Sequence, residues 1–312
     1  MTPAAAIPVF IASVALMLAA SAIFAARLDH IGQILGLPET LLGLLTALAA
    51  DAPEISSAIT ALVSHQKSVA VGVVVGSNAF NLAAMLGLSA VVASRVRARH
   101  EALKVEAFVG LWFVAVCLAI VAGGIGGRFG IALVAVVAVP YVFLLGRGET
   151  PEHARERGVN VWKESRHVVA LLAVALVLIV GGSIGAVRSA TDLAHTWSVP
   201  PALVGVLILA ILTSLPNAWT GIRFGLHGRG SALMSETLNS NSINLAVGIT
   251  LAAAIGSLGT LTHVDVFNVS WVLGMTAVAV VLFGRRNGGG RVAGALLIAL
   301  YAVFVVVQFA SI

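Results

Sequence analysis

The chain has 312 residues, of which 59% are hydrophobic and only 10% charged, and its formal net charge is +5. A soluble protein carries charge on about a quarter of its residues, so the composition excludes a soluble domain and indicates a polytopic membrane protein. The basic residues sit in connecting loops, so the positive charge is not evidence for nucleic-acid binding. The single cysteine, Cys117, lies in an apolar segment and is expected to be an inert packing residue.

Ten apolar segments follow one another along the chain, each long enough or nearly so for a spanning helix of about 20 residues. They cover residues 4–26, 36–63, 68–94, 102–123, 127–146, 167–187, 200–225, 231–257, 265–284 and 291–311. The predicted fold class is therefore an all-α membrane protein with ten transmembrane helices. No small-residue cleavage region follows the first segment, so we expect a retained helix there.

Loop charge predicts the orientation. With ten spans, alternate loops lie on the same side, and fifteen of the eighteen basic residues fall in loops 1–2, 3–4, 5–6, 7–8 and 9–10. The opposite side holds only Lys67, Arg128 and Arg188. The positive-inside rule places the basic side in the cytoplasm. We expect a multi-pass protein of the plasma membrane with both termini extracytoplasmic.

The longest polar connection, 147–166, lies at the midpoint and is predicted to be a cytoplasmic linker between two five-helix repeats, 1–146 and 167–312. Five spans are an odd number, so the halves insert upside-down to one another. Five proline, serine and asparagine residues recur at one offset of 163: Pro38, Pro53, Ser77, Asn78 and Asn81 match Pro201, Pro216, Ser240, Asn241 and Asn244. Inverted repeats with broken helices are typical of secondary transporters, whose site lies at mid-membrane.

The second segment carries two acids and a proline where a bilayer is expected. A charge at the bilayer centre costs at least about 2.5 kcal/mol, and Pro53 removes a backbone donor. Asp51 and Glu54 are three residues apart, which places them on one face of a helix. No basic residue lies mid-membrane to pair with them, so this stretch indicates a cation site. The seventh segment repeats the shape around Pro216, and both helices are predicted to be broken.

Polar residues at helical spacing extend this site to the third, seventh and eighth segments. The candidate metal-binding residues are Asp51, Glu54, Ser77, Asn81, Thr213, Ser214, Asn217, Glu236, Ser240 and Asn244. Their oxygens suit a hard cation, and calcium takes about 6–8 of them. Histidines and cysteines do not cluster, which argues against a soft transition metal.

Each feature also has a structural interpretation. Hydroxyl and amide side chains can simply hydrogen-bond membrane helices together, and the two prolines can be plain kinks. Glu236 can be solvated near a cytoplasmic helix end, and solvation is the favoured interpretation for Glu39 and Glu106, which lie close to predicted helix ends.

The chain resembles the alpha repeats of the calcium/cation antiporter superfamily in two runs and their echoes. The runs are Pro53-Glu54 and Gly76-Ser77-Asn78-Ala79-Phe80-Asn81, and the echoes lie in segments seven and eight. The ten-helix plan covers the whole chain, and the specific motifs cover residues 43–87 and 205–248. The resemblance implies an electrochemical antiporter in which two broken helices pair their acids around calcium. Flanking hydroxyls, amides and carbonyls would hold sodium, and the first two helices of the repeats' outer bundle would slide past this core.

Carried over by position, the resemblance makes Glu54 the central acid of the first repeat. It makes Ser77 and Asn81 the helix-3 ligands, and Thr213, Ser214 and Ser240 the hydroxyls of the second repeat. The chain departs from the family pattern at four places. Ala50-Asp51 replaces Thr-Ser, Asn217 replaces the second glutamate, Asn244 is neutral where some members carry aspartate, and Asn239 replaces a glycine. We therefore hypothesise that Asp51 substitutes for the missing second acid.

The function expected is a secondary active antiporter that exchanges Ca²⁺ for Na⁺ or H⁺ by alternating access. Two adjacent acids repel when both are ionised, which favours a proton as counter-ion, while the retained hydroxyls keep sodium possible. The alternatives are a transporter of another cation, K⁺ or Mg²⁺, in the same fold, and a non-transporting relative. The chain lacks the motifs of an intramembrane hydrolase, so no enzyme is expected. The expected partners are the lipid bilayer and inorganic cations, without a cofactor or nucleic acid, in a monomer or weak homo-oligomer.

Overall fold

The computed structural model describes residues 2–35, 37, 39–97, 100–147, 161–255 and 262–310. Within these ranges the chain is almost entirely helical, and nine helices are long and apolar enough to cross a membrane. They correspond to nine of the ten predicted segments, so the prediction of an all-α membrane protein is confirmed. Pro38 and most of the predicted linker, 148–160, fall outside the described residues.

Two short helices lie within the second predicted segment, 36–63. Helix α2 ends at Ala50, α3 begins at Ala52, and Asp51 lies between them with Pro53 in the first turn of α3. The first half contains α1 (Pro3–Ile34), α2 (Glu39–Ala50), α3 (Ala52–Val63), α4 (Lys67–Asn81), the π-helical segment η1 (Leu82–Leu88), α5 (Ser89–Val92), strand β1 (Arg95–Val96), α6 (His100–Val121) and α7 (Gly127–Gly146).

In the second half, the expected break at Pro216 is not found. Helix α10 continues through this proline, which a membrane helix tolerates when its surroundings satisfy the freed backbone groups. This half contains α8 (Val161–Thr196), α9 (Pro201–Leu203), η3 (Val204–Leu209), α10 (Ala210–Leu226), α11 (Gly230–Ile243), η4 (Asn244–Leu251), α12 (Ala252–Ile255), α13 (His263–Phe283), strand β2 (Gly289–Gly290) and α14 (Arg291–Ala310).

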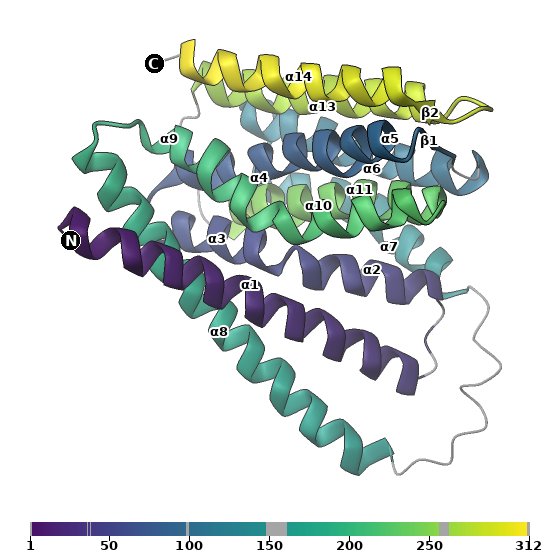
Figure 1. The fold of residues 1–312 in the computed structure, drawn as a ribbon, viewed down its shortest axis with the longest axis horizontal. Coiled ribbons are helices and arrows are strands. Elements are labelled where there is room, and N and C mark those ends of the chain that lie inside the picture. Colours follow the sequence, from purple (N-terminus) through teal and green to yellow (C-terminus); the bar gives the residue numbers. More distant parts are fainter. Residues whose placement is uncertain are drawn as a thin grey trace.

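Helices α1 and α8 form a long pair that crosses the rest of the molecule at an angle (Figure 1). Both extend beyond the predicted segments 4–26 and 167–187. Their backbones approach closely at Gly182, where a Cβ atom would lie 2.8 Å from the carbonyl oxygen of Ser13. This pair packs against α3, so it borders the break at Asp51.

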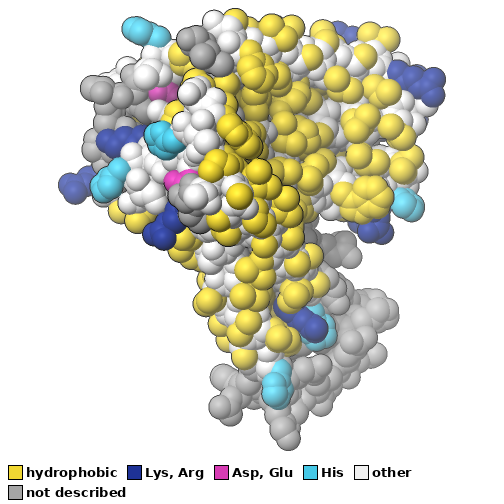
Figure 2. All heavy atoms as spheres, turned by 60° about the vertical axis from the view of Figure 1, so that its left-hand side comes forward, with side chains coloured by type: hydrophobic (Ala, Val, Ile, Leu, Met, Phe, Trp, Pro, Cys, Tyr) yellow, Lys and Arg dark blue, Asp and Glu magenta, His cyan; other side chains and the backbone are white. Residues whose placement is uncertain are grey.

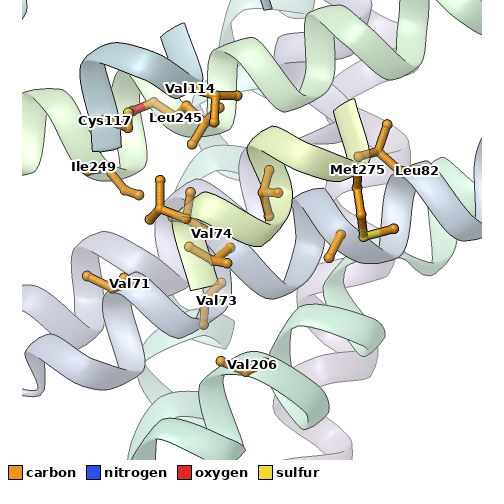
Figure 3. Packing of buried hydrophobic residues seen from close by; sticks show 14 of the residues in the cluster. Val71, Val73, Val74, Leu82, Val114, Cys117, Val206, Leu245, Ile249 and Met275 are labelled. Atoms are coloured by element: carbon orange, nitrogen blue, oxygen red, sulfur yellow. The ribbon is translucent and has the colours of Figure 1, made fainter. Parts of the chain in front are cut away.

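Helix α4 occupies the centre of the remaining bundle. Its residues from Val69 to Ala79 are buried, because α3, η3, α10, α13 and η4 all pack against it. Figure 3 shows its valines among side chains from several of these helices: Val71, Val73 and Val74 with Val206, Ile249 and Met275. At Gly76 a Cβ would lie 2.7 Å from that of Ala210, so α4 and α10 meet nearly backbone to backbone.

The loops meet in the alternating pattern that the ten-span topology predicts. Strand β1, in loop 3–4, pairs antiparallel with β2, in loop 9–10, and Gly230, at the end of loop 7–8, packs on the backbone of Arg97. These three loops therefore share one end of the molecule, which we call the arginine-rich end. At the other end the Thr191 hydroxyl donates to Gln66 over 2.6 Å.

The outer surface is largely apolar between the two ends. Side chains such as Val136, Val139, Val177 and Val306 are exposed, as expected of residues that face lipid. Figure 2 shows a broad hydrophobic face, with lysine, arginine and histidine side chains near its edges. Cys117 is fully buried and lies 3.4 Å from the Leu245 carbonyl oxygen, which confirms a packing role.

Candidate cation-binding site

The break between α2 and α3 leaves one carbonyl group without its helical partner. Pro53 has no N–H, so it cannot donate to the carbonyl oxygen of Ala49, four residues earlier. The buried Ser21 hydroxyl on α1 donates to that oxygen over 3.2 Å. The sequence predicts that Pro53 removes a backbone donor, but it does not predict the role of Ser21, because nothing in it indicates which helix packs beside the break.

The two acids at this break meet polar groups from the other half of the chain. Asp51 and Glu54 are both 0% exposed. The Asn217 amide on α10 donates to Asp51 Oδ1 over 2.8 Å and to Glu54 Oε1 over 3.4 Å. The Ser214 hydroxyl donates to Glu54 Oε1 over 2.9 Å. One turn of α10 therefore holds both carboxylates of the first half.

Ser240, on α11, links this pair to α4. Its hydroxyl donates to Asp51 Oδ1 over 2.6 Å and accepts from the Asn81 amide over 3.2 Å. The Asn217 amide also approaches the same hydroxyl, at 3.4 Å. The structure therefore brings together six of the ten predicted site residues: Asp51, Glu54, Asn81, Ser214, Asn217 and Ser240.

Several buried oxygen atoms, four of them on residues of this cluster, have no hydrogen-bond partner among the described residues. Within the described part of the chain, Asp51 and Glu54 each keep one buried carboxylate oxygen that no donor reaches. The amide oxygens of Asn81, Asn217 and Asn244 are likewise buried and unpaired. Buried polar atoms are normally paired, so a group of unpaired oxygens indicates a site that can accept a positive charge.

The other four predicted residues do not hydrogen-bond to this cluster. The hydroxyls of Ser77 and Thr213 donate to carbonyls of their own helices, Val74 at 3.0 Å and Leu209 at 2.9 Å. The side chain of Asn244 is buried with both polar atoms unpaired. Glu236 also has a buried, unpaired Oε2, which argues against full solvation.

Glu236 does not complete a group of three acids. Among the described residues, no three His, Cys, Asp or Glu side chains lie together as a metal-binding group. Among the hydrogen-bonded residues of the cluster, Asp51 and Glu54 are thus the two carboxylates, and Asn81, Ser214, Asn217 and Ser240 are neutral.

A reciprocal pair of asparagines lies beside the site, between α4 and α11. The Asn78 amide donates to the Asn241 carbonyl oxygen, and the Asn241 amide donates to the Asn78 carbonyl oxygen, each over 3.1 Å. The two residues are separated by 163 positions, the offset found between the halves of the sequence. This pair joins the two halves directly, in addition to the contacts of the acids.

The solvated position expected for Glu106 is wrong. This side chain is only 8% exposed, and Glu106 Oε1 accepts from the Ser235 hydroxyl over 2.5 Å. The sequence places Glu106 near the start of a segment, where solvent is the simple expectation, but α11 packs over this turn of α6. The side chain of Glu39 lies outside the described set.

The fold and the buried polar centre define a multi-pass helical membrane protein with an acidic, oxygen-rich core. The chain belongs to the sodium/calcium exchanger protein family, whose model matches residues 5–146 and 167–310. A curated relative is the inner membrane protein YrbG of Escherichia coli K12. It is 24% identical over 286 residues, which cover 88% of this chain and 87% of the relative.

Two solved structures share the fold. The sodium-calcium exchanger NCX_Mj superposes with a TM-score of 0.69 at 18% identity, over 98% of this chain and 99% of that chain. The H⁺/Ca²⁺ exchanger CAX superposes with a TM-score of 0.79 at 18% identity, over 96% of this chain and 82% of that chain. The match to the sodium/calcium exchanger family model confirms the family resemblance noted in the sequence, and these two structures show the same fold.

Proposed function

We propose that this protein is a secondary active cation antiporter that exchanges Ca²⁺ for Na⁺ or H⁺ by alternating access. The observation that carries the proposal is the meeting of Asp51 and Glu54, fully buried, with Ser214, Asn217 and Ser240 from the other half. Two carboxylates balance the charge of one divalent cation. The named activities of NCX_Mj and CAX, sodium-calcium and proton-calcium exchange, agree with this proposal.

The proposed ligands are the oxygens that no donor reaches. One carboxylate oxygen from each of Asp51 and Glu54 would join the amide oxygens of Asn81 and Asn217. Calcium takes about 6–8 oxygens at 2.3–2.6 Å, so hydroxyl and main-chain oxygens near the Asp51 break would complete the shell. In the proposal the hydroxyls of Ser77 and Thr213 bind sodium after rotating away from the carbonyls of their own helices. Glu236 lies on the ion path, and Asn244 supplies a further amide oxygen.

The proposed architecture is two inverted five-helix repeats, 1–146 and 167–312, joined by a cytoplasmic linker, 147–166. The reciprocal bonds of Asn78 and Asn241 support it, because a two-fold relation between repeats requires such mutual pairs. The packing of α4 on α10, mirrored by that of α11 on α2, supports it as well. In this scheme the protein is a plasma-membrane protein whose arginine-rich end is cytoplasmic, so both termini are extracytoplasmic.

The counter-ion is proposed to be a proton or sodium. Two carboxylates in one fully buried cluster repel when both are charged, and a bound proton relieves that repulsion when calcium leaves. Sodium would relieve it in the same way and would use the neutral oxygens.

The test is calcium flux in proteoliposomes, with a pH jump and a sodium gradient applied separately. We expect one of the two gradients to drive calcium uptake by the wild-type protein, and Asp51→Asn and Glu54→Gln each to reduce uptake at least about 10-fold. This loss corresponds to about 1.4 kcal/mol, close to the lower end of the range of about 1.5–3 kcal/mol for a hydrogen bond to a charged group. Unchanged uptake in both variants would overturn the assigned site. Gradient-driven K⁺ or Mg²⁺ flux without Ca²⁺ flux would identify another cation, and no flux with no calcium binding in a titration would identify a non-transporting relative.

A further inference from the structure

A second polar network lies on a different face of α11 from Ser240, which contacts the acid cluster. Tyr141 on α7 donates to Asn239 Oδ1 over 2.7 Å, and the Asn239 amide donates to the Ser235 hydroxyl over 3.3 Å. The Ser235 hydroxyl in turn donates to Glu106 Oε1 over 2.5 Å. Glu106, Tyr141 and Asn239 are each no more than 8% exposed, so this network is largely shielded from solvent. None of its members belongs to the acid cluster.

All the donors in this network point in one direction. When Glu106 is ionised it can only accept, and each group of the network then donates its hydrogen toward Glu106. A hydroxyl has a single hydrogen, so Ser235 cannot donate to Glu106 and to Asn239 at once. The direction of the whole chain is therefore tied to whether Glu106 carries a proton.

The protonated state has a definite alternative pattern. When one proton binds Glu106, its O–H donates to the Ser235 oxygen, and the Ser235 hydrogen turns to Asn239. The Asn239 amide then rotates so that its oxygen accepts from Ser235 and its nitrogen donates to the Tyr141 oxygen. No covalent bond changes apart from the one formed by the added proton.

Within the described residues, Tyr141 is the titratable group that interacts with the charge of Glu106. Glu236 follows Ser235 in the sequence, but it interacts with the charges of Asp51 and Arg229. Segment η4, which also packs against α6, has no charged residue. The other charged side chains that the structure describes on or just beyond α6, α7 and α13 lie near the helix ends or line the pocket between α6 and α13: Lys104, Arg128, Arg147, His263, Asp265 and Arg285.

The packing of α6 on α11 fixes this geometry. Gly110, one turn after Glu106, lies against Ser242 and Leu238, with 3.6 Å from an added Cβ to the Ser242 hydroxyl. Asn239, the central member, stands where the family pattern has glycine, and glycine has no side chain to connect Tyr141 with Ser235. Asn239 also precedes Ser240, whose hydroxyl holds Asp51 over 2.6 Å.

We propose that Glu106, Ser235, Asn239 and Tyr141 form a proton-binding relay with two hydrogen-bonding states, separate from the acid cluster of Asp51 and Glu54. When Glu106 takes up a proton, the hydrogen bonds of the relay reverse their direction. The amide of Asn239, the residue before Ser240, then rotates. The ligand of this site is a proton from the side of the arginine-rich end, because Glu106 lies within two turns of the start of α6 at His100. The relay thereby senses pH without occupying the cation site.

The test is an infrared difference titration of the protein in lipid nanodiscs, with pH as the only variable. We expect a protonated-carboxyl band that grows as the pH falls and loses one component in Glu106→Gln. Tyr141→Phe removes the donor at the far end of the network, which supports the ionised state of Glu106. The Glu106 component of the band should therefore appear at a higher pH. Tyr301→Phe is the matched control, because the Tyr301 hydroxyl is buried without a partner among the described residues, and it should leave the band unchanged.

Two results would overturn the relay. One is a carboxyl band in Glu106→Gln that equals the wild-type band. The other is an unshifted Glu106 component in both Tyr141→Phe and Asn239→Ala. If Glu106→Gln fails to fold, Ser235→Ala replaces it. This variant should also move the Glu106 component of the carboxyl band to a higher pH, and an unmoved component would contradict the relay. The titration uses no ion gradient, so its outcome is independent of whether the protein exchanges calcium.

Discussion

Asn217 is the residue on which the geometry of the acid pair depends. Its amide donates to both carboxylates, over 2.8 Å to Asp51 and 3.4 Å to Glu54, so a neutral group from the second half bridges two like charges of the first. The family pattern places one acid in each half, whereas this chain carries both acids on one side and the amide opposite. The total charge is the same, and only its distribution differs.

This redistribution leads to a charge-swap prediction. Asp51→Ser removes one of two negative charges, and we expect calcium transport to fall at least about 10-fold, the effect of about 1.4 kcal/mol. Adding Asn217→Glu returns the second charge from the opposite side, so the double variant should recover most of the lost transport. Calcium uptake into proteoliposomes measures both.

The single variant Asn217→Glu is the control for this swap, because it places three acids in the cluster and should transport poorly. A double variant no better than Asp51→Ser would show that the second half cannot supply the acid in this chain.

Much of the site could be predicted from residue type alone. Asp51, Glu54 and Ser240 were identifiable because polar groups are rare in apolar segments, and each lies in the cluster. The orientation of Ser77 and Thr213 was not predictable, because a hydroxyl on a helix can bond to its own backbone as readily as to a neighbouring helix. The burial of Glu106 depends on how α11 packs on α6, which local sequence does not encode.

At the scale of the elements, the two proline-containing segments behave differently. The chain breaks at Asp51 before Pro53, while α10 continues through Pro216. The sequence shows the same proline in both and predicts a break in both. At the first proline, the Ser21 hydroxyl on α1 satisfies the carbonyl oxygen of Ala49 that Pro53 leaves free. A partner from another helix cannot be predicted from the local sequence around either proline.

The α1–α8 pair offers a prediction at the same scale. Gly182→Ala would place a methyl group 2.9 Å from the Cβ of Met17, so the helices must separate. Overpacking of this kind costs about 1–3 kcal/mol, and we expect a lower melting temperature for the purified protein in detergent.

The neighbouring residue provides the matched control for this substitution. Gly181→Ala meets nothing within 4 Å, and alanine favours the helix over glycine, so its melting temperature should be equal or higher. Equal melting temperatures for the two variants would mean that α1 and α8 do not pack closely at this position.

At the scale of the whole molecule, the distribution of basic loops predicts the orientation in the membrane. Asn287 is exposed at the arginine-rich end and Ser68 at the opposite end. We expect a membrane-impermeant maleimide added to intact cells to label Ser68→Cys, and to label Asn287→Cys only after permeabilisation. The reverse pattern would place the arginine-rich end outside.

The wild-type protein is the blank in this labelling experiment, because its single cysteine, Cys117, is fully buried.

The ten-segment plan and the alternation of loops could be read from apolar length and charge, because both follow from the bilayer itself. The packing of α4 at the centre could not, since nearly every segment is equally apolar.

The division of the second segment into two 12-residue helices bears on how the protein is made. Neither helix alone spans a bilayer, and the pair carries two acids, each of which costs about 2.5–3.5 kcal/mol at the centre on insertion scales. Their partners Ser214, Asn217 and Ser240 leave the ribosome more than 150 residues later. The stretch that carries the site is therefore the one least able to enter the membrane by itself during synthesis, and its final placement depends on the arrival of the second half.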